Sequence, residues 1–307
     1  MITLFTTPKP FRGHIEVIQR NAIHSWTLLR PACEIILIGD EDGVAEVAAE
    51  YRVRHVPEMA RNEHGTPLVN DLFETGQRLA VNDLMCYINC DIVLMSDFMR
   101  AIEQVARLKH RFLMVGHRWN IDVTESLDFG PEWENTFRAR LTNDGTLGHP
   151  TAIDYFVFPR GLWGDIPPFA LGRTKWDNWL LSRALAREAV LIDATPTVMI
   201  AHQNHDYSHH PDGHAGIWHG AEAKRNLELT GGWANITSLR DATHALTPEG
   251  LRFAYERLHL SQFLSALRVV RPSLRIPADL LLKAMALARP VRAWARRAPS
   301  SKGSQHA

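Results

Sequence analysis

The chain has 307 residues, of which 45% are hydrophobic and 22% charged, and its 34 basic and 34 acidic residues cancel. These proportions favour a globular protein with one main domain, and they exclude long disorder and an overall positive field suited to nucleic acid. An odd number of cysteines, a start unlike a signal peptide and no apolar run of about 18 residues predict a cytoplasmic protein without a membrane span.

The first half of the sequence alternates short apolar runs with segments of helical spacing. Between the first two runs, Ile18, Ala22 and Trp26 recur at helical intervals, and Pro31 stands where a helix could not continue. This alternation predicts parallel strands joined by helices, with ligands bound beyond the carboxyl ends of the strands. The predicted strands are 2–6, 34–38, 53–56, 84–94 and 112–115, and the predicted helices are 13–29, 44–51 and 68–79.

The second half begins with a polar stretch, residues 118–150, rich in Gly, Asn and Asp. We expect it to be a long excursion over the site rather than a regular layer. Apolar runs return at 155–158, 190–192 and 198–201, and we expect them to extend the same sheet.

The last 48 residues, 260–307, carry nine Lys and Arg but only one acid, Asp279. Leucines and Met285 share this segment with the basic residues, a composition suited to contact with an anionic membrane on its inner face. The alternative is a helix packed on the domain with a solvated basic face, which Pro290 would interrupt.

Two polar residues, Asn89 and Asp91, interrupt the apolar run 84–95. Alternation along a strand would point both to one side, where their oxygens could hold a hard cation that grips a diphosphate. The structural alternative is that Asp91 caps a helix beginning near Ser96.

This strand end resembles the D-x-D-like triplet of the GT-A nucleotide-sugar glycosyltransferases. The flanking segments 3–11 (TLFTTPKPF), 35–40 (IILIGD) and 65–70 (GTPLVN) resemble a little-described bacterial and plant group of such transferases. The resemblance implies an α/β fold, a GT-A Rossmann-like α/β/α sandwich with a mostly parallel central sheet, over residues 1–250. A helical, basic C-terminal extension, 251–307, would follow it.

The same resemblance assigns nucleotide-sugar contacts to the first two strand ends. Thr6 and Thr7 would contact the base and ribose, and Asp40 follows the second strand. Asn89 stands where the family usually has aspartate, so Asp91 needs ligands from elsewhere to hold Mn²⁺ or Mg²⁺.

A histidine-rich segment, residues 198–210, follows the last predicted strand with four histidines and an aspartate. In several GT-A enzymes a histidine just after a late strand completes the metal shell, which by resemblance is His202, with His205 next. His209 and His210 are weaker candidates, and a polar loop bonded to its own backbone is the structural alternative.

The acceptor side is predicted from a mixture of carboxylates, aromatic rings and basic groups in residues 154–181. Asp154, Trp176 and Asn178 are the candidate acceptor-binding residues, since sugars bind aromatic faces and hydrogen-bonding groups. Asp177 is the candidate catalytic base of an inverting transfer, or else an acid that only stabilises a helix N-terminus.

Several basic and amide groups are candidates for the donor's phosphates or ribose. Arg61 and Asn70 flank the turn at Gly65, although a solvated arginine is the structural alternative there. Arg173 and Lys175 could also compensate diphosphate charge.

Together these features predict a divalent-metal-assisted glycosyltransferase that moves a sugar from a nucleoside diphosphate to an acceptor hydroxyl, as in polysaccharide biosynthesis. One alternative is a metal-dependent hydrolase using His202 and His205, although no Glu lies between them to act as base. A domain that binds nucleotide sugars or glycans without turnover is the other.

Overall fold

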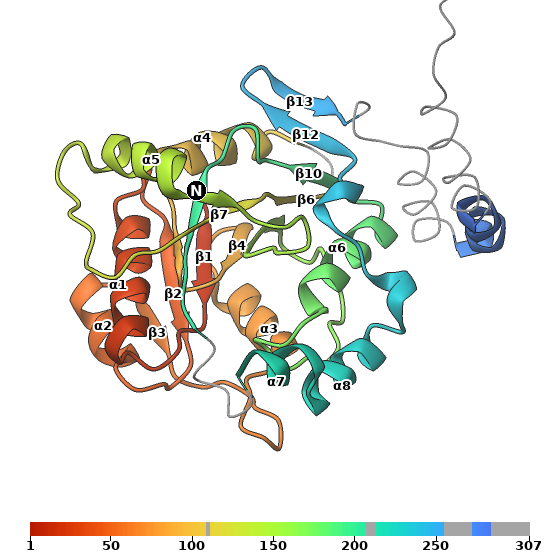
Figure 1. Cartoon of the computed structure of the whole chain (residues 1–307), viewed down its shortest axis with the longest axis horizontal. Coiled ribbons are helices and arrows are strands. Elements are labelled where there is room, and N and C mark those ends of the chain that lie inside the picture. Colours follow the sequence, from red (N-terminus) through yellow and green to blue (C-terminus); the bar gives the residue numbers. More distant parts are fainter. Residues whose placement is uncertain (109–110, 207–212, 255–271, 284–307) are drawn as a thin grey trace, which may run out of the picture.

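A computed structural model describes residues 1–108, 111–206, 213–254 and 272–283 (Figure 1). Its central sheet has nine strands in the order β13-β12-β10-β6-β9-β4-β1-β2-β3. The pairs β1–β2, β1–β4, β2–β3, β6–β10 and β10–β12 are parallel, whereas β9 runs antiparallel to both β4 and β6. The strands are β1 (Thr3–Thr6), β2 (Glu34–Ile38), β3 (Arg54–Val56), β4 (Leu84–Ile88), β6 (Phe112–Val115), β9 (Tyr155–Pro159), β10 (Val190–Asp193), β12 (His244–Thr247) and β13 (Gly250–Phe253).

Helices cover both faces of this sheet because its strands are apolar on both sides. Along β1, Leu4 packs into one buried cluster and Phe5 into another. The first cluster includes α1 (Gly13–Thr27), α2 (Val44–Tyr51) and α4 (Ser96–Val105), and the second includes α3 (Val69–Leu79) and α6 (Trp176–Ala186). The predicted α/β class, a mostly parallel sheet between two helical layers, is confirmed.

A second sheet has the order β5-β11-β7-β8. It consists of β5 (Ile92–Val93), β7 (Arg118–Ile121), β8 (Thr146–Leu147) and β11 (Ile200–Gln203), and α5 (Trp133–Asp144) packs against it through Phe137 and Leu141. Two predictions are therefore wrong. The 198–201 run does not extend the central sheet, and residues 118–150 contain two strands and a helix, because Ile121, Phe137 and Leu141 bury a third apolar cluster.

The predicted strand 84–94 is also divided. β4 ends at Ile88, and the N–H of Ile92 donates to the carbonyl of Asn89 at 3.2 Å, which closes a turn over residues 89–91. Alternation therefore does not place Asn89 and Asp91 on one side. The sequence of this run resembles one strand because most of its residues are apolar, although β4 and β5 belong to different sheets.

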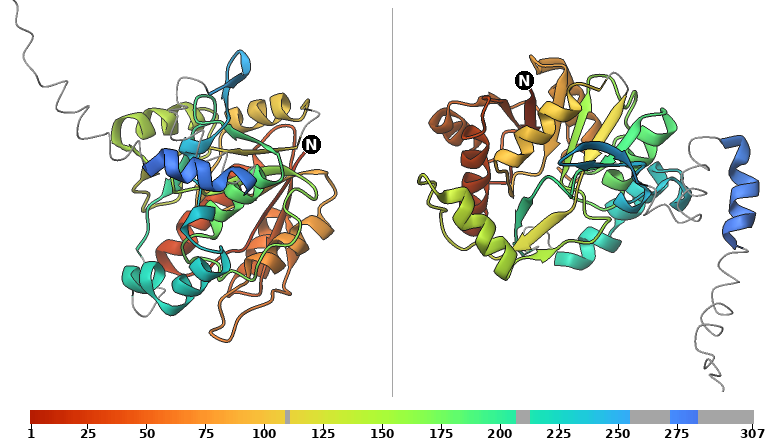
Figure 2. Two further views of the ribbon diagram at one scale, coloured as in Figure 1. Left: turned by 90° about the vertical axis from the view of Figure 1, so that its right-hand side faces the viewer. Right: turned by 90° about the horizontal axis from the view of Figure 1, so that it is seen from above.

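The remaining elements are short helices and turns of the second half of the chain. They are α7 (Gly213–His219), α8 (Ala221–Leu229), and the short 3-10 turns Trp233–Asn235, Leu239–Asp241 and Pro272–Leu274. The β12–β13 hairpin projects at one edge (Figure 2, left). Among the described helices, none combines the length and apolar character that crossing a bilayer requires.

Most of the basic segment 260–307 lies outside the described residues. Within it, the structure describes a 3-10 turn at 272–274 and a helix at 275–283. The division of the chain at residue 250 stays a prediction.

Candidate active site

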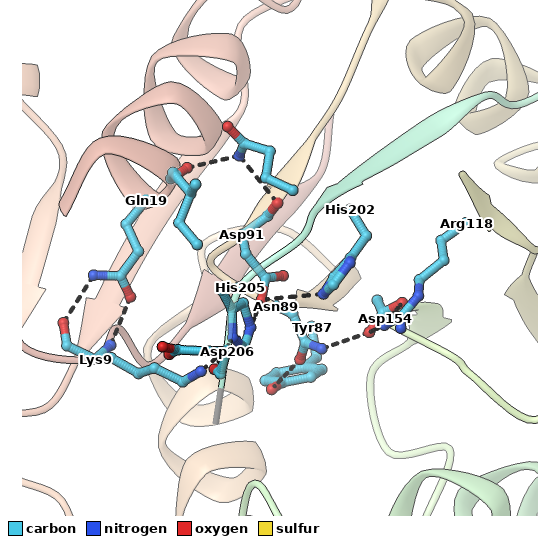
Figure 3. A network of polar contacts seen from close by, with 12 residues as sticks. Lys9, Gln19, Tyr87, Asn89, Asp91, Arg118, Asp154, His202, His205 and Asp206 are labelled. Carbon is cyan, nitrogen blue, oxygen red and sulfur yellow. Dashed lines mark hydrogen bonds and ion pairs between the residues drawn. The ribbon is translucent and has the colours of Figure 1, made fainter. Parts of the chain in front are cut away.

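The pairing of β5 with β11 brings Asp91 to His202. These strands run antiparallel with His202 opposite Ile92, and the N–H of Gln203 donates to the carbonyl of Asp91 at 3.2 Å. Because β5 starts one residue after Asp91, the register of the second sheet fixes the carboxylate beside the histidine. His205 follows two residues after β11 and lies on the same side (Figure 3).

Asp91, His202 and His205 form a compact group of potential metal ligands. Oδ2 of Asp91 lies 3.2 Å from Nε2 of His205 and 3.7 Å from Nε2 of His202. One ligand atom from each of the three residues lies within 4.8 Å of the others. In the described part of the chain, Oδ1 of Asp91 and Nδ1 of His202 are buried without a hydrogen-bond partner. Unsatisfied buried polar atoms are rare, so the group fits a divalent cation.

The protonation states of two of these residues also suit a cation. Burial opposes ionisation of Asp91, but the charges of His202 and His205 and the hydrogen bond from His205 outweigh it and lower its pKa. Burial lowers the pKa of His202 against the opposing charge of Asp91. An ionised carboxylate beside a neutral imidazole is the form in which these groups bind metals.

Asn89 belongs to a different network from Asp91. Its Oδ1 accepts from the hydroxyl of Tyr87 at 2.8 Å, and its Nδ2 donates to Oδ1 of Asp154 at 2.7 Å. Nη1 of Arg118 donates to both oxygens of Asp154, at 3.0 and 2.9 Å. The side chains of Asn89 and Asp154 thus bind each other (Figure 3).

The structure links two of the predicted nucleotide-sugar residues, Asp40 and Arg61. Nη2 of Arg61 lies 2.8 Å from both Oδ1 of Asp40 and Oε1 of Glu41. The hydrogen bond from Arg61 lowers the pKa of the Asp40 carboxyl. Arg61 is thus ion-paired and joins the loops that follow β2 and β3, and its contact with the donor stays a prediction.

Three further nucleotide-sugar candidates lie on the first strand end and on α3. Thr6 is fully buried at the end of β1 and Asn70 lies in the first turn of α3, and each has a buried side-chain oxygen without a partner among the described residues. Thr7 lies beside Gly39, where any added Cβ would stand 3.1 Å from the Thr7 hydroxyl. The unsatisfied oxygens lie where a nucleotide is expected.

Asp177 has the environment of a proton acceptor. It lies in the first turn of α6, and its buried Oδ1 has no partner in the described chain. Burial raises its pKa to about 7, with the charge of Asp154 adding to that rise and backbone hydrogen bonds at Asn178 and Asp177 opposing it. A base with a pKa near the working pH accepts and returns a proton efficiently.

The other predicted acceptor residues are not exposed to a ligand. Trp176 is only 6% exposed and its ring packs against Phe73, Tyr87 and Phe156. Asn178 is buried and donates to the carbonyl of Thr151 at 3.2 Å. The aromatic face of Trp176, which we expect to contact a sugar, packs in the core, and the acceptor role of both residues stays a prediction.

Trp233, in the 3-10 turn that contacts α6, is an exposed aromatic residue with 65% of its surface accessible. Nζ of Lys175 lies 4.7 Å from its ring centroid, and Lys175 has a left-handed φ of 89° just before α6. A non-glycine residue rarely adopts this conformation without a functional or packing reason. Nothing in the composition around Trp233 distinguished it in the sequence.

Lys9 is the second residue that the sequence interpretation missed. Its Nζ lies 3.4 Å from Nε2 of His205, across 196 positions of the chain. The flanking Pro8 and Pro10 could have indicated Lys9 as a functional residue, because two prolines restrict the backbone on both sides of the lysine. His209 and His210 lie outside the described residues.

No protein-family model and none of the curated proteins matches this sequence. Solved structures are similar to it in fold. Glucosyl-3-phosphoglycerate synthase from Mycobacterium tuberculosis, in complex with Mg²⁺ and uridine diphosphate, is 12% identical with a TM-score of 0.45, over 76% of this chain and 80% of that one. S. aureus TarS 1-349, in complex with UDP-GlcNAc, is 9% identical with a TM-score of 0.43, over 66% and 58%. This likeness concerns the α/β arrangement alone.

Proposed function

We propose that this chain is a glycosyltransferase that moves a sugar from a nucleoside diphosphate to an acceptor hydroxyl. The observation that supports it most is the convergence of Asp91, His202 and His205 at the strand edge, with buried polar atoms that lack partners. Such an edge is where open α/β sheets bind nucleotides. One carboxylate suits Mn²⁺ or Mg²⁺, and the two imidazoles favour Mn²⁺ of the two.

The three ligands would hold the cation where Asp91 meets β11. A bound divalent cation supplies positive charge to a diphosphate leaving group. The chain's part is to keep Asp91 ionised and His202 neutral and to hold both rigidly through the β5–β11 register. Arg118 and Asp154 hold the turn before Asp91 from the other side through Asn89.

Asp177 would take the proton of the acceptor. As the acceptor oxygen forms its bond to the anomeric carbon, its O–H proton passes to the Asp177 carboxylate. The bond from that carbon to the diphosphate oxygen breaks, and the nucleoside diphosphate leaves with the electron pair. The pKa of about 7 allows Asp177 to be ionised before this step and to release the proton afterwards.

A thermal-shift panel tests the proposal. Nucleoside diphosphates with different bases are added with and without Mn²⁺, and we expect at least one to raise the melting temperature by several degrees with Mn²⁺. Stabilisation by none of them would remove the proposal. Incubation with the matching nucleotide sugar then distinguishes activities, since a sugar released to water without any acceptor product indicates hydrolysis.

We also propose that the basic segment contacts anionic membrane at the cytoplasmic face. The described helix 275–283 exposes Ile276, Leu280 and Leu281 beside Arg275 and Lys283, the mixture of an interfacial helix. In the full chain, changing Arg289, Arg292, Arg296 and Arg297 to Gln should lower sedimentation with phosphatidylserine vesicles, and not with neutral vesicles. Unchanged sedimentation contradicts this contact.

A further inference from the structure

Lys9 lies in a place where a lysine is costly to keep. Its Nζ is 3.4 Å from Nε2 of His205, a proposed ligand atom, and its side chain is partly buried. The negative groups that face it are Asp91 and the exposed Asp206, while His205 adds a potential positive charge. A buried ammonium group persists in proteins when something compensates its charge.

The backbone of Lys9 is held rigidly, so its position is built into the fold. The N–H of Lys9 donates to Oε1 of Gln19 at 2.6 Å, and Nε2 of Gln19 donates back to the carbonyl of Lys9 at 2.8 Å. Gln19 is itself buried in α1, and Pro8 and Pro10 restrict the backbone on both sides. Figure 3 shows this clamp and the lysine side chain extending from it toward His205.

Lys9 and a cation at Asp91 would be neighbours of like charge. The carboxylate of Asp91 neutralises one of the two charges of a divalent cation, and neutral imidazoles neutralise none, so a positive charge remains beside the ammonium group. Such a pair is unfavourable unless an anion lies against both groups. The diphosphate of a nucleotide sugar carries one ionised group on each phosphate, which matches these two positive charges.

We propose that Lys9 is the second cationic contact of the donor diphosphate, acting beside the metal ligands rather than as one of them. This assignment rests on the proposed function. It differs from the sequence prediction, in which Arg173 and Lys175 compensated the diphosphate, because Arg173 is paired with Glu222 at 2.6 Å and Lys175 lies over Trp233.

The test measures two affinities separately in the full chain. One is for Mn²⁺ alone, by electron paramagnetic resonance, and the other is for the nucleoside diphosphate that stabilises the wild type best, by calorimetry with saturating Mn²⁺. Lys9→Met keeps the length of the side chain and removes its charge. We expect diphosphate binding about ten- to a hundredfold weaker, since a charge-assisted contact is lost, and Mn²⁺ binding unchanged or tighter, since a like charge is removed.

Matched variants separate this role from a structural one. Lys9→Arg keeps the charge and should recover at least a third of the lost diphosphate affinity on a logarithmic scale, and Lys224→Met, on the exposed side of α8, should change neither affinity. The matching nucleoside, which lacks phosphates, should bind Lys9→Met and wild type within about threefold. If Lys9→Met does not fold, Lys9→Gln is compared with Lys9→Arg in the same way.

Each other outcome has a distinct meaning. Diphosphate binding by Lys9→Met within threefold of wild type would overturn the role of Lys9 and leave the transferase proposal standing. Equal losses of Mn²⁺ and diphosphate binding would also overturn it, because Lys9 would then only build the metal site. If the wild type itself binds no nucleoside diphosphate, the proposed function fails first.

Discussion

The Asp91 centre and the Arg173–Glu222 pair are both charged groups near the carboxyl edge of the sheet. They differ in whether their buried polar atoms all have hydrogen-bond partners. Nη2 and Nε of Arg173 bind Oε2 of Glu222 at 2.6 and 2.8 Å, and Asn62 donates to its other oxygen at 2.6 Å. Around Asp91, by contrast, Oδ1 of the carboxylate and Nδ1 of His202 lack partners in the described chain. A structural ion pair satisfies itself, whereas a binding centre keeps atoms for a ligand.

The largest expected effect comes from removing the negative charge of the Asp91 centre. Asp91→Asn should abolish stabilisation by Mn²⁺ and lower sugar transfer by about a thousandfold or more, because the carboxylate is the only anionic group among the three proposed ligands. Thermal shift with Mn²⁺ and initial rates measure these losses. Wild-type Mn²⁺ stabilisation in a folded Asp91→Asn protein would contradict the proposed centre.

The proposed base should give a smaller loss with its own pH signature. Asp177→Asn should lower kcat/KM by at least about a hundredfold. In the wild type, kcat/KM should rise with pH up to about 7 and then level, since burial raises the pKa of Asp177 to about 7 and only its ionised form accepts a proton. Rates between pH 5 and 9 test this. If Asp177→Asn kept the wild-type rate and pH profile, Asp177 would not be the base and would only stabilise the N-terminus of α6.

Breaking the Arg173–Glu222 pair should lower the stability of the fold and leave metal binding unchanged. Glu222→Ala leaves Arg173 uncompensated at 11% exposure, so we expect about 2 kcal/mol lower stability, less than for a fully buried pair. Mn²⁺ affinity should stay within about threefold of wild type. Urea unfolding and Mn²⁺ titration test both parts, and a loss of Mn²⁺ binding without a loss of stability would reverse the comparison.

The smallest effect should come from restoring the aspartate that the GT-A resemblance leads one to expect. Asn89→Asp places a second carboxylate against Asp154, from which the Asn89 amide nitrogen is now 2.7 Å away, and removes that donor. We expect about 1 kcal/mol lower stability and no tighter Mn²⁺ binding. Tighter Mn²⁺ binding at unchanged stability would show that residue 89 can turn toward the metal.

The sequence predicted seven of the nine strands of the central sheet, most of them short apolar runs between helical periods, but it did not predict β12 and β13, which are partly exposed. The sequence prediction failed at the turn over residues 89–91 and at the 198–201 run. In both places a buried apolar strand of the second sheet has the same sequence pattern as a strand of the central sheet. Sheet membership depends on long-range pairing, such as β5 with β11, which periodicity does not carry.

Within the site, the sequence allowed the candidate metal ligands to be predicted, but not the residues that surround them. Asp91, His202 and His205 were chosen from clustering at strand ends, helped by the family resemblance, and the structure brings them together. The burial of Trp176 was not predictable, because an aromatic residue at a helix start suits the core as well as a sugar. Lys9 was overlooked because a single lysine in a loop becomes informative only when His205 is seen beside it.

The assembly of the centre from β5 and β11 has a consequence for folding. Asp91 and His205 are 114 positions apart, so a cation bound to both would cross-link the chain across a long loop and depend on the β5–β11 pairing. The site would form only once β5 and β11 have paired within the second sheet. Cation affinity is thus a measure of completed folding, and chelation would selectively loosen β11, which faster-exchanging amide protons on that strand would report.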